Sequence, residues 1–297
     1  MPNRNFLLYA VPALIWGSTW FVITFQLGVV DPLISVVYRY VLAGVIMMLY
    51  CWIQKLPMRF SGRQHFFMAL QGAFLFGINY WMAYKAEEYI PSGLMAVAFS
   101  TIVFANSILG YLLMGKPINR GVIIGALFGL TGTLLIFSRE FFSMAFSDQI
   151  LWGAGIAMGS VLLASLGNLA SARNTAAGVP VIQANAYSMV YGAGMMALLG
   201  LALGKEFVFV WTTQYVLSLL YLSIFGSIIA FGFYLTLVGK IGADKAAYAL
   251  VVIPIISIVL STLFEGYQFT AYSFGGIALI ILGNLFALRK KKVVKVA

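Results

Sequence analysis

Long apolar runs alternate with short polar connections along almost the whole chain. The runs are about 20 residues long, the length that a helix needs to cross the hydrocarbon core of a bilayer. They are too continuous for the alternating strands of a membrane β-barrel, and helices satisfy their own backbone polar groups in lipid. The pattern predicts ten spans: Asn5–Gln26, Leu33–Ile53, Gln64–Ala86, Ser92–Met114, Gly121–Phe137, Leu151–Asn174, Val181–Leu203, Tyr215–Gly239, Lys245–Phe264 and Tyr272–Leu288.

Composition agrees with this pattern. Hydrophobic residues make up 62% of the chain and charged residues 9%, whereas a soluble domain is about half apolar and about a quarter charged. We therefore predict an all-α polytopic membrane protein. The single cysteine, Cys51, lies within an apolar run and gives neither a disulfide framework nor a metal cluster. The spans contain no nucleophile–histidine pair, so we expect no enzyme, no cofactor and no metal site.

Basic residues lie in the short connections and in the tail "LRKKKVVKVA", not in one patch. The net charge of +10 therefore indicates membrane orientation, and we expect no nucleic-acid partner. With both termini in the cytoplasm, 14 of the 18 Lys and Arg residues fall on the inner side: Arg4, Lys55, Arg59, Arg63, Lys116, Arg120, Arg173, Lys240, Lys245, Arg289, Lys290, Lys291, Lys292 and Lys295. Lys85, Arg139 and Lys205 fall outside.

Acidic residues show the opposite distribution. Asp244 falls inside, and the outer acids are Asp31, Glu87, Glu88, Glu140, Asp148, Glu206 and Glu265. We therefore expect a multi-pass protein of the bacterial inner membrane with both termini cytoplasmic. Its expected partners are the lipid bilayer and a small-molecule substrate.

The second half of the chain repeats the first. At a constant offset of 151 residues, Ile90 aligns with Ile241 and Gly115 with Gly266. At an offset of 148, "DPLISVVYRYVLAGVIMML" aligns with "VPVIQANAYSMVYGAGMMA". Because five spans are an odd number, the two halves enter the membrane from opposite sides. The sequence thus predicts two inverted five-helix repeats, residues 1–145 and 146–297, an arrangement that recurs in transporters.

Several stretches resemble one known family. They are "ALIWGSTWF", "VYRYVLAGV" and "AEEYIPSGLMAVAFSTIVFANSILGYLLMGKPI" in the first half and "GADKAAYALVVIPIISIVLSTLFEGYQFT" in the second. In this order, across essentially the whole chain, they resemble the EamA-type branch of the drug/metabolite transporter superfamily. The second repeat keeps the family's mid-helix proline as Pro254, whereas Val103 stands at that position in the first repeat.

The resemblance implies alternating access around a central cavity lined by spans 1, 3, 4, 6, 8 and 9. It also implies export of amino acids or related small metabolites. Two alternatives stay open. One is efflux of aromatic or cationic drugs, which the 15% aromatic content suggests. The other is a non-transporting membrane scaffold or accessory protein.

Arg39 places a permanent charge inside the second span. It lies about seven residues from the outer end, and so about 10 Å deep at 1.5 Å per residue. It can snorkel outward or pair with an outer carboxylate, namely Asp31, Glu87 or Glu88. We expect Arg39, Glu87 and Glu88 to form an outer gate or structural ion pair, with direct substrate contact by Arg39 as the alternative.

Polar and aromatic side chains within the spans are the candidate substrate-binding residues, because polar groups in lipid face the bundle or a cavity. They are Trp16, Thr19, Asn79, Tyr80, Tyr84, Ser100, Asn106, Asn168, Tyr234, Tyr248, Pro254 and Ser257. Aromatic belts at the interface and helix packing by small residues are the alternative explanations. Pro254 frees a backbone carbonyl near mid-membrane.

We expect no acidic residue near the bilayer centre, where a proton relay or a polyamine carrier would place one. The predicted substrate is therefore neutral or zwitterionic. Transport would proceed by facilitated diffusion, by exchange or by weak coupling through Glu87 or Glu88. The glycine-rich last span, "FGGIALIILGNLF", could pack within the monomer or form a homodimer.

Overall fold

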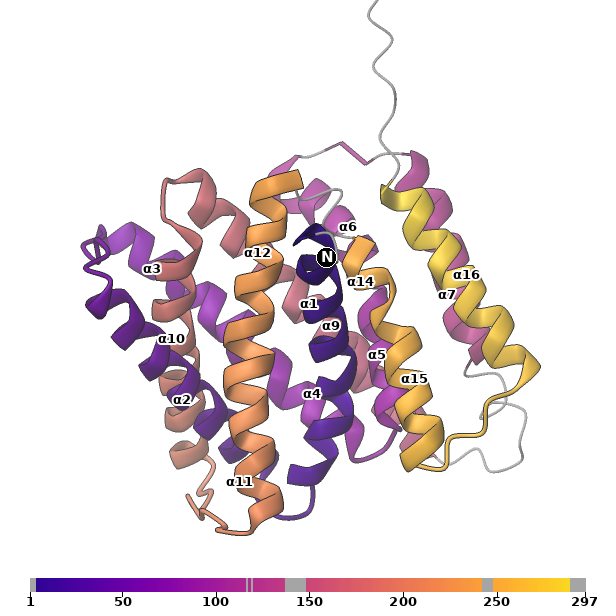
Figure 1. Cartoon of the computed structure of the whole chain (residues 1–297), viewed down its shortest axis with the longest axis horizontal. Coiled ribbons are helices and arrows are strands. Elements are labelled where there is room, and N and C mark those ends of the chain that lie inside the picture. Colours follow the sequence, from indigo (N-terminus) through magenta and orange to yellow (C-terminus); the bar gives the residue numbers. More distant parts are fainter. Residues whose placement is uncertain (1–3, 116, 119, 137–147, 242–247, 289–297) are drawn as a thin grey trace, which may run out of the picture.

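The computed structural model is a bundle of helices (Figure 1), and it describes residues 4–115, 117–118, 120–136, 148–241 and 248–288. The first half contains α1 (Arg4–Ile23), η1 (Thr24–Gln26), α2 (Pro32–Ile53), α3 (Gly62–Gln71), η2 (Gly72–Ile78), α4 (Asn79–Glu87), α5 (Ser92–Ser100), α6 (Ile102–Met114) and α7 (Arg120–Ile136). The second half contains α9 (Asp148–Ala176), α10 (Val181–Ala202), α11 (Thr213–Leu220), η3 (Tyr221–Ile229), α12 (Ala230–Ile241), α14 (Tyr248–Val251), α15 (Ile253–Phe264) and α16 (Ala271–Leu288).

Within these residues the helices form ten successive segments at the positions of the ten predicted spans. Six segments are both long and apolar enough to cross a membrane by themselves: Phe6–Gln26, Pro32–Ile53, Gly62–Glu87, Ser92–Met114, Asp148–Ala176 and Thr213–Tyr234. Shorter apolar helices cover Ile123–Ile136, Ile253–Phe264 and Ala271–Phe286. The prediction of an all-α polytopic membrane protein is confirmed.

Local sequence signals explain where two of these helices begin. At the start of α2, the Asp31 side chain accepts a hydrogen bond from the Leu33 N–H at 2.9 Å, and Pro32 occupies the first turn. A carboxylate cap followed by proline is a favourable helix start. At the start of α3, Ser61 and Gln64 form a capping box, which satisfies two free N–H groups at once.

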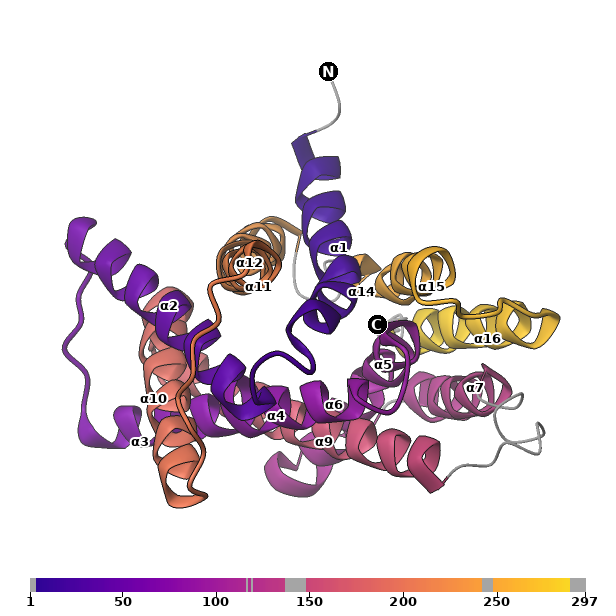
Figure 2. The same cartoon turned by 90° about the horizontal axis from the view of Figure 1, so that it is seen from below.

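Repeat-equivalent helices pack against each other and run antiparallel. In the α2–α10 pair, Gly44 lies against Val190, and Gly200 lies against Leu33. In the α7–α16 pair, Gly132 lies against Gly276. Figures 1 and 2 show these two pairs at opposite edges of the bundle. Antiparallel packing of equivalent helices is the arrangement that two inverted repeats produce.

The α7–α16 interface shows the inversion residue by residue. The carbonyl oxygen of Gly276 approaches Gly132, and the carbonyl oxygen of Gly125 approaches Gly283. The 151-residue offset aligns Gly125 with Gly276 and Gly132 with Gly283. Each of the two contacts is therefore the repeat equivalent of the other. Glycine at these positions lets the two backbones come close, as small residues do in membrane helix packing.

Irregular helix geometry also occurs at matching places in the two halves. The third segment of each half contains a π-helical stretch, η2 in the first and η3 in the second. The fourth segment of each half is broken, at Thr101 between α5 and α6 and at Val252 between α14 and α15. Such π-helical turns often occur at functional sites, and broken helices line the substrate sites of many transporters.

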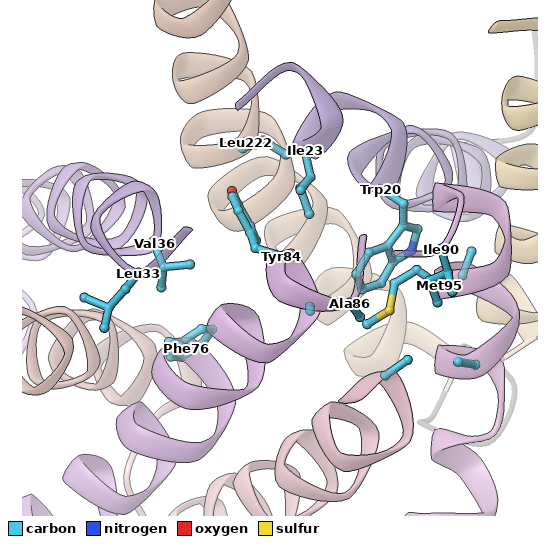
Figure 3. Packing of buried hydrophobic residues seen from close by; sticks show 14 of the residues in the cluster. Trp20, Ile23, Leu33, Val36, Phe76, Tyr84, Ala86, Ile90, Met95 and Leu222 are labelled. Carbon is cyan, nitrogen blue, oxygen red and sulfur yellow. The ribbon is translucent and has the colours of Figure 1, made fainter. Parts of the chain in front are cut away.

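Buried apolar residues are distributed unequally between the two ends of the bundle. The main cluster lies mostly in the half that the charge distribution predicts to be outer. Figure 3 shows part of it: Trp20, Ile23, Leu33, Val36, Phe76, Tyr84, Ala86, Ile90, Met95 and Leu222. Toward the predicted inner end, the described residues form two separate clusters instead. One contains Leu8, Leu237 and Ala249, and the other contains Met68, Val179 and Ala184.

Candidate functional site

Aromatic side chains from three spans meet in one group, which we call the aromatic cluster: Trp16, Phe76, Phe231 and Tyr234. The Trp16 ring is 5.0 Å from the Phe231 ring and 5.4 Å from the Tyr234 ring, centroid to centroid. Phe231 also contacts Phe76 of η2, at 6.2 Å. The Trp16 indole N–H donates to the Gly226 carbonyl at 3.1 Å, which fixes the orientation of the ring. Trp16, Phe231 and Tyr234 are only half-buried, so part of each ring stays accessible.

Arg39 lies next to this cluster and is buried, with 1% relative exposure. Its Nε donates a hydrogen bond to Ser227 Oγ at 3.2 Å. Its guanidinium carbon is 4.5 Å from the ring centroid of Tyr80 and 5.3 Å from that of Tyr40. Nη1 has no hydrogen-bond partner within the described residues. Arg39 therefore stays inside the bundle and does not snorkel to the interface.

The outer carboxylates considered as partners of this arginine have other surroundings. Glu88 pairs with Lys85 at 2.7 Å, and Asp31 pairs with Lys205 at 2.8 Å. The hydrogen bond from Lys205 to Asp31, together with the carboxylate charge, raises the pKa of Lys205 above its ordinary value. Glu87 is buried, and neither of its carboxyl oxygens has a hydrogen-bond partner in the part of the chain that the structure describes.

A hydrogen-bond network joins four spans near the predicted outer end. Tyr84 donates its O–H to Gln26 Oε1 at 3.0 Å, and Gln26 Nε2 donates to Ser218 Oγ at 3.2 Å. Beside them, the hydroxyl oxygens of Ser35 and Tyr215 are 3.1 Å apart. All five side chains are buried. This outer network holds the first, second, third and eighth spans together.

A second, inner network lies toward the other end. Gln71 Nε2 donates to Asn185 Oδ1 at 2.9 Å, and Asn174 Nδ2 donates to Gln71 Oε1 at 3.0 Å. The 148-residue offset aligns Gln26 with Asn174, so the two networks contain one pair of repeat-equivalent residues. Sequence reasoning missed Gln26 and all three inner residues. Polar residues that recur at one repeat offset are the signal that could have found Gln26 and Asn174.

Two predicted site residues use their polar atoms in helix packing. Ser160 Oγ donates to Asn79 Oδ1 at 2.8 Å, while Asn79 Nδ2 donates to the Leu75 carbonyl at 2.9 Å. Ser257 Oγ donates to the Gly17 carbonyl at 2.6 Å. Asn79 thus links α4 to α9, and Ser257 links α15 to α1. Both side chains are almost completely buried.

Two further predicted residues bond to their own helix. Thr19 Oγ1 donates to the Trp16 carbonyl at 2.8 Å, and Ser100 Oγ donates to the Val97 carbonyl at 2.6 Å. Hydroxyl groups that bond back to the preceding turn often bend a helix. Ser100 lies directly before the break between α5 and α6.

Asn106 and Asn168 come together from different halves of the chain. Asn168 Nδ2 donates to Asn106 Oδ1 at 3.4 Å, a long hydrogen bond that links α9 to α6. Both side chains are half-buried, so their remaining amide atoms stay accessible.

Pro254 is buried in the first turn of α15, just after the break at Val252. The 151-residue offset aligns Val252 with Thr101, where the first half has its own break without a proline. The repeat architecture thus breaks this helix in both halves, and Pro254 fits the second break because proline suits a helix start. The backbone of Tyr248 lies in α14, and its side chain lies outside the described residues.

The model of the EamA-like transporter family matches this chain twice, over residues 4–138 and 151–289. The two matches cover most of the first half and most of the second. The chain belongs to the EamA-like transporter family. The ten helical segments, the antiparallel packing of equivalent helices and the paired helix breaks agree with membership of this family.

Several relatives of this EamA-like transporter are named as transporters or efflux pumps. The uncharacterized transporter YvbV of Bacillus subtilis is 28% identical, over 99% of this chain and 95% of that protein. The uncharacterized inner membrane transporter YedA of Escherichia coli is 28% identical, over 84% of this chain and 79% of that protein. A probable amino-acid metabolite efflux pump of Escherichia coli is 22% identical, over 100% and 99%.

A solved crystal structure has the same fold as this EamA-like transporter. The TM-score is 0.69 at 18% sequence identity, and the match covers 97% of each chain. This likeness concerns the fold alone.

Proposed function

We propose that this EamA-like transporter exports small metabolites across the bacterial inner membrane by alternating access. The observation that carries the proposal is the unequal closure of the two ends. One continuous apolar cluster and the outer network join the spans at the predicted outer end, whereas at the inner end the described residues form two separate clusters and the inner network. A carrier that is sealed on one side and divided on the other is ready to accept a solute from the divided side.

Neutral or zwitterionic amino acids are the substrate class that we propose. The amide groups of Asn106 and Asn168 and the half-buried rings of Trp16 and Tyr234 offer dipoles and aromatic faces without a free carboxylate. Such groups suit a small solute without net charge. The amino-acid metabolite efflux pump of Escherichia coli, which aligns over 100% of this chain, supports the same class.

Efflux of aromatic or cationic drugs is the second candidate. Trp16, Phe231 and Tyr234 form a half-buried aromatic wall, and aromatic faces attract organic cations. Arg39 lies against Tyr40, which contacts Phe76 of the aromatic cluster, and its charge repels a cation, which favours the first candidate.

Counterflow tests the proposal. Liposomes that contain the purified protein are preloaded with a mixed amino-acid pool. One labelled amino acid is then added to the outside solution. We expect transient accumulation of the label, because a carrier exchanges internal for external substrate without an energy source. Accumulation of a labelled aromatic cation, with no response to any amino acid, would favour the drug candidate. No accumulation of either label by folded protein would contradict carrier function.

Trp16→Leu should lower the counterflow rate several-fold at low substrate concentration. Contact with an aromatic face contributes about 0.5–2 kcal/mol to binding, and this change removes the ring at the centre of the aromatic cluster. Trp152→Leu is the matched control, because Trp152 is 63% exposed. Equal counterflow rates for the two variants, at equal thermal stability, would show that the aromatic cluster is not part of the substrate site.

A further inference from the structure

Glu87 is the last residue of α4, and its side chain has 7% relative exposure. Neither carboxyl oxygen has a hydrogen-bond partner among the residues that the structure describes. An ionised carboxylate without a partner is so costly to remove from water that such groups take up a proton instead. The helix end adds to this cost, because the free carbonyl groups there carry partial negative charge.

Among the described residues, three titratable groups interact electrostatically with Glu87. They are Glu265 at the end of α15, Arg39 of α2 and Tyr84 of α4. Glu265 is a like charge and favours the protonated form of Glu87, whereas Arg39 opposes it. The Arg39 Nε is already bonded to Ser227 Oγ, and Arg39 forms neither of the ion pairs found among the described residues.

The Glu265 carboxylate, unlike that of Glu87, accepts hydrogen bonds from described residues. Its Oε2 accepts hydrogen bonds from Ser92 N–H at 3.2 Å and from Ser92 Oγ at 2.9 Å. Ser92 begins α5, and the positive end of a helix stabilises a carboxylate. Glu265 is also only half-buried, so water still reaches it. Of the two carboxyl groups, Glu87 is therefore the one whose charge no hydrogen-bond donor among the described residues stabilises.

We propose that Glu87 is a proton-binding site that takes up one proton when the predicted outer end closes. This inference rests on the alternating-access cycle proposed above. On closure, a proton from water on the outer side adds to the Glu87 carboxylate. On opening, water reaches the group, and the proton returns to the same side. Sequence reasoning left Glu87 and Glu88 as equal candidates for coupling, and the surroundings of the two groups favour Glu87.

The test measures equilibrium exchange of a labelled amino acid in liposomes with equal substrate and equal pH on both sides. The pH is varied from about 6 to about 9, and the result does not depend on the orientation of the protein. If closure of the outer end takes up one proton, its equilibrium constant falls by at most about tenfold for each unit by which the pH rises. We expect wild-type exchange to slow as the pH rises, and Glu87→Gln exchange to show little pH dependence.

Glu88→Gln is the matched control. Glu88 is the next residue, is exposed and pairs with Lys85, so this variant should keep the wild-type pH profile. A Glu87→Gln profile that is identical to the wild-type profile would overturn the proposal. A flat wild-type profile would overturn it as well.

Infrared spectroscopy provides a readout that needs no transport. We expect a protonated carboxyl C=O band at neutral pH in the wild type and in Glu88→Gln, and its loss in Glu87→Gln. No difference between the wild type and Glu87→Gln would overturn the proton site. If the wild type exchanges no amino acid, the proposed function fails, and the carboxyl band still decides whether Glu87 holds a proton.

Discussion

Gly192→Ala should destabilise the protein by about 3 kcal/mol, at the upper end of the usual cost of overpacking. A Cβ atom at residue 192 would lie 2.6 Å from the Gly72 carbonyl oxygen. The obstacle is backbone on both sides, because Gly72 begins the π-helical stretch η2 and Gly192 lies within α10. One of the two helices must move away, which loosens the packing between the two halves. Thermal unfolding in detergent measures the effect as a lower Tm.

Gly194→Ala is the matched control, two residues further along α10. A Cβ atom there meets nothing within 4 Å. This substitution should leave the Tm unchanged or raise it slightly, because alanine favours the helix more than glycine does. Equal Tm values for the two variants would mean that α10 and η2 do not pack as closely as described.

Arg39→Ala should reduce stability by about 3 kcal/mol or more and should also abolish transport. It removes the hydrogen bond to Ser227 and the contact with the Tyr80 ring, and it leaves a cavity where a long side chain was buried. It also removes the positive charge that opposes protonation of Glu87. The measurements are Tm in detergent and counterflow in liposomes.

Two comparison variants show what the guanidinium itself contributes. Arg39→Lys keeps the charge but loses the planar group that lies against the ring, so we expect an intermediate loss. Arg59→Ala changes an exposed arginine in the connection before α3 and should behave as the wild type does. An Arg39→Ala variant with normal Tm and normal transport would show that Arg39 contributes neither to stability nor to transport.

Much of the fold could be predicted from the sequence, because lipid allows few solutions for an apolar run of about 20 residues. The helices Pro32–Ile53 and Ser92–Met114 lie where the apolar runs placed them. The antiparallel packing of α7 with α16 follows from the repeat offset that aligns Gly125 with Gly276.

The partners of the polar residues could not be predicted in the same way. Arg39 and Ser227 are 188 residues apart in the chain, and no local pattern relates them. Asn79 was expected to face a cavity, yet its amide is bonded to Ser160 and Leu75. Whether a polar group in a span serves packing or a solute depends on the rotation of its helix against its neighbours, which hydropathy does not record.

The π-helical stretches η2 and η3 were also invisible in the sequence. Their residues, GAFLFGI and YLSIFGSII, lie inside apolar runs and do not interrupt the helical pattern. The inner network was missed for a different reason, since Gln71 is a single polar residue inside the predicted span Gln64–Ala86. Its partners Asn174 and Asn185 lie more than 100 residues further along the chain, and all three side chains are buried.

The most direct test of alternating access is a pair of distance measurements by double electron–electron resonance. One pair of spin labels is placed at the predicted inner end, on Arg63 and Thr236, and the other at the outer end, on Glu88 and Gln214; all four positions are exposed. Alternating access predicts that adding a transported amino acid moves part of the population toward a shorter inner distance and a longer outer distance. Distances that stay fixed while transport proceeds, or that change in the same direction, would contradict it.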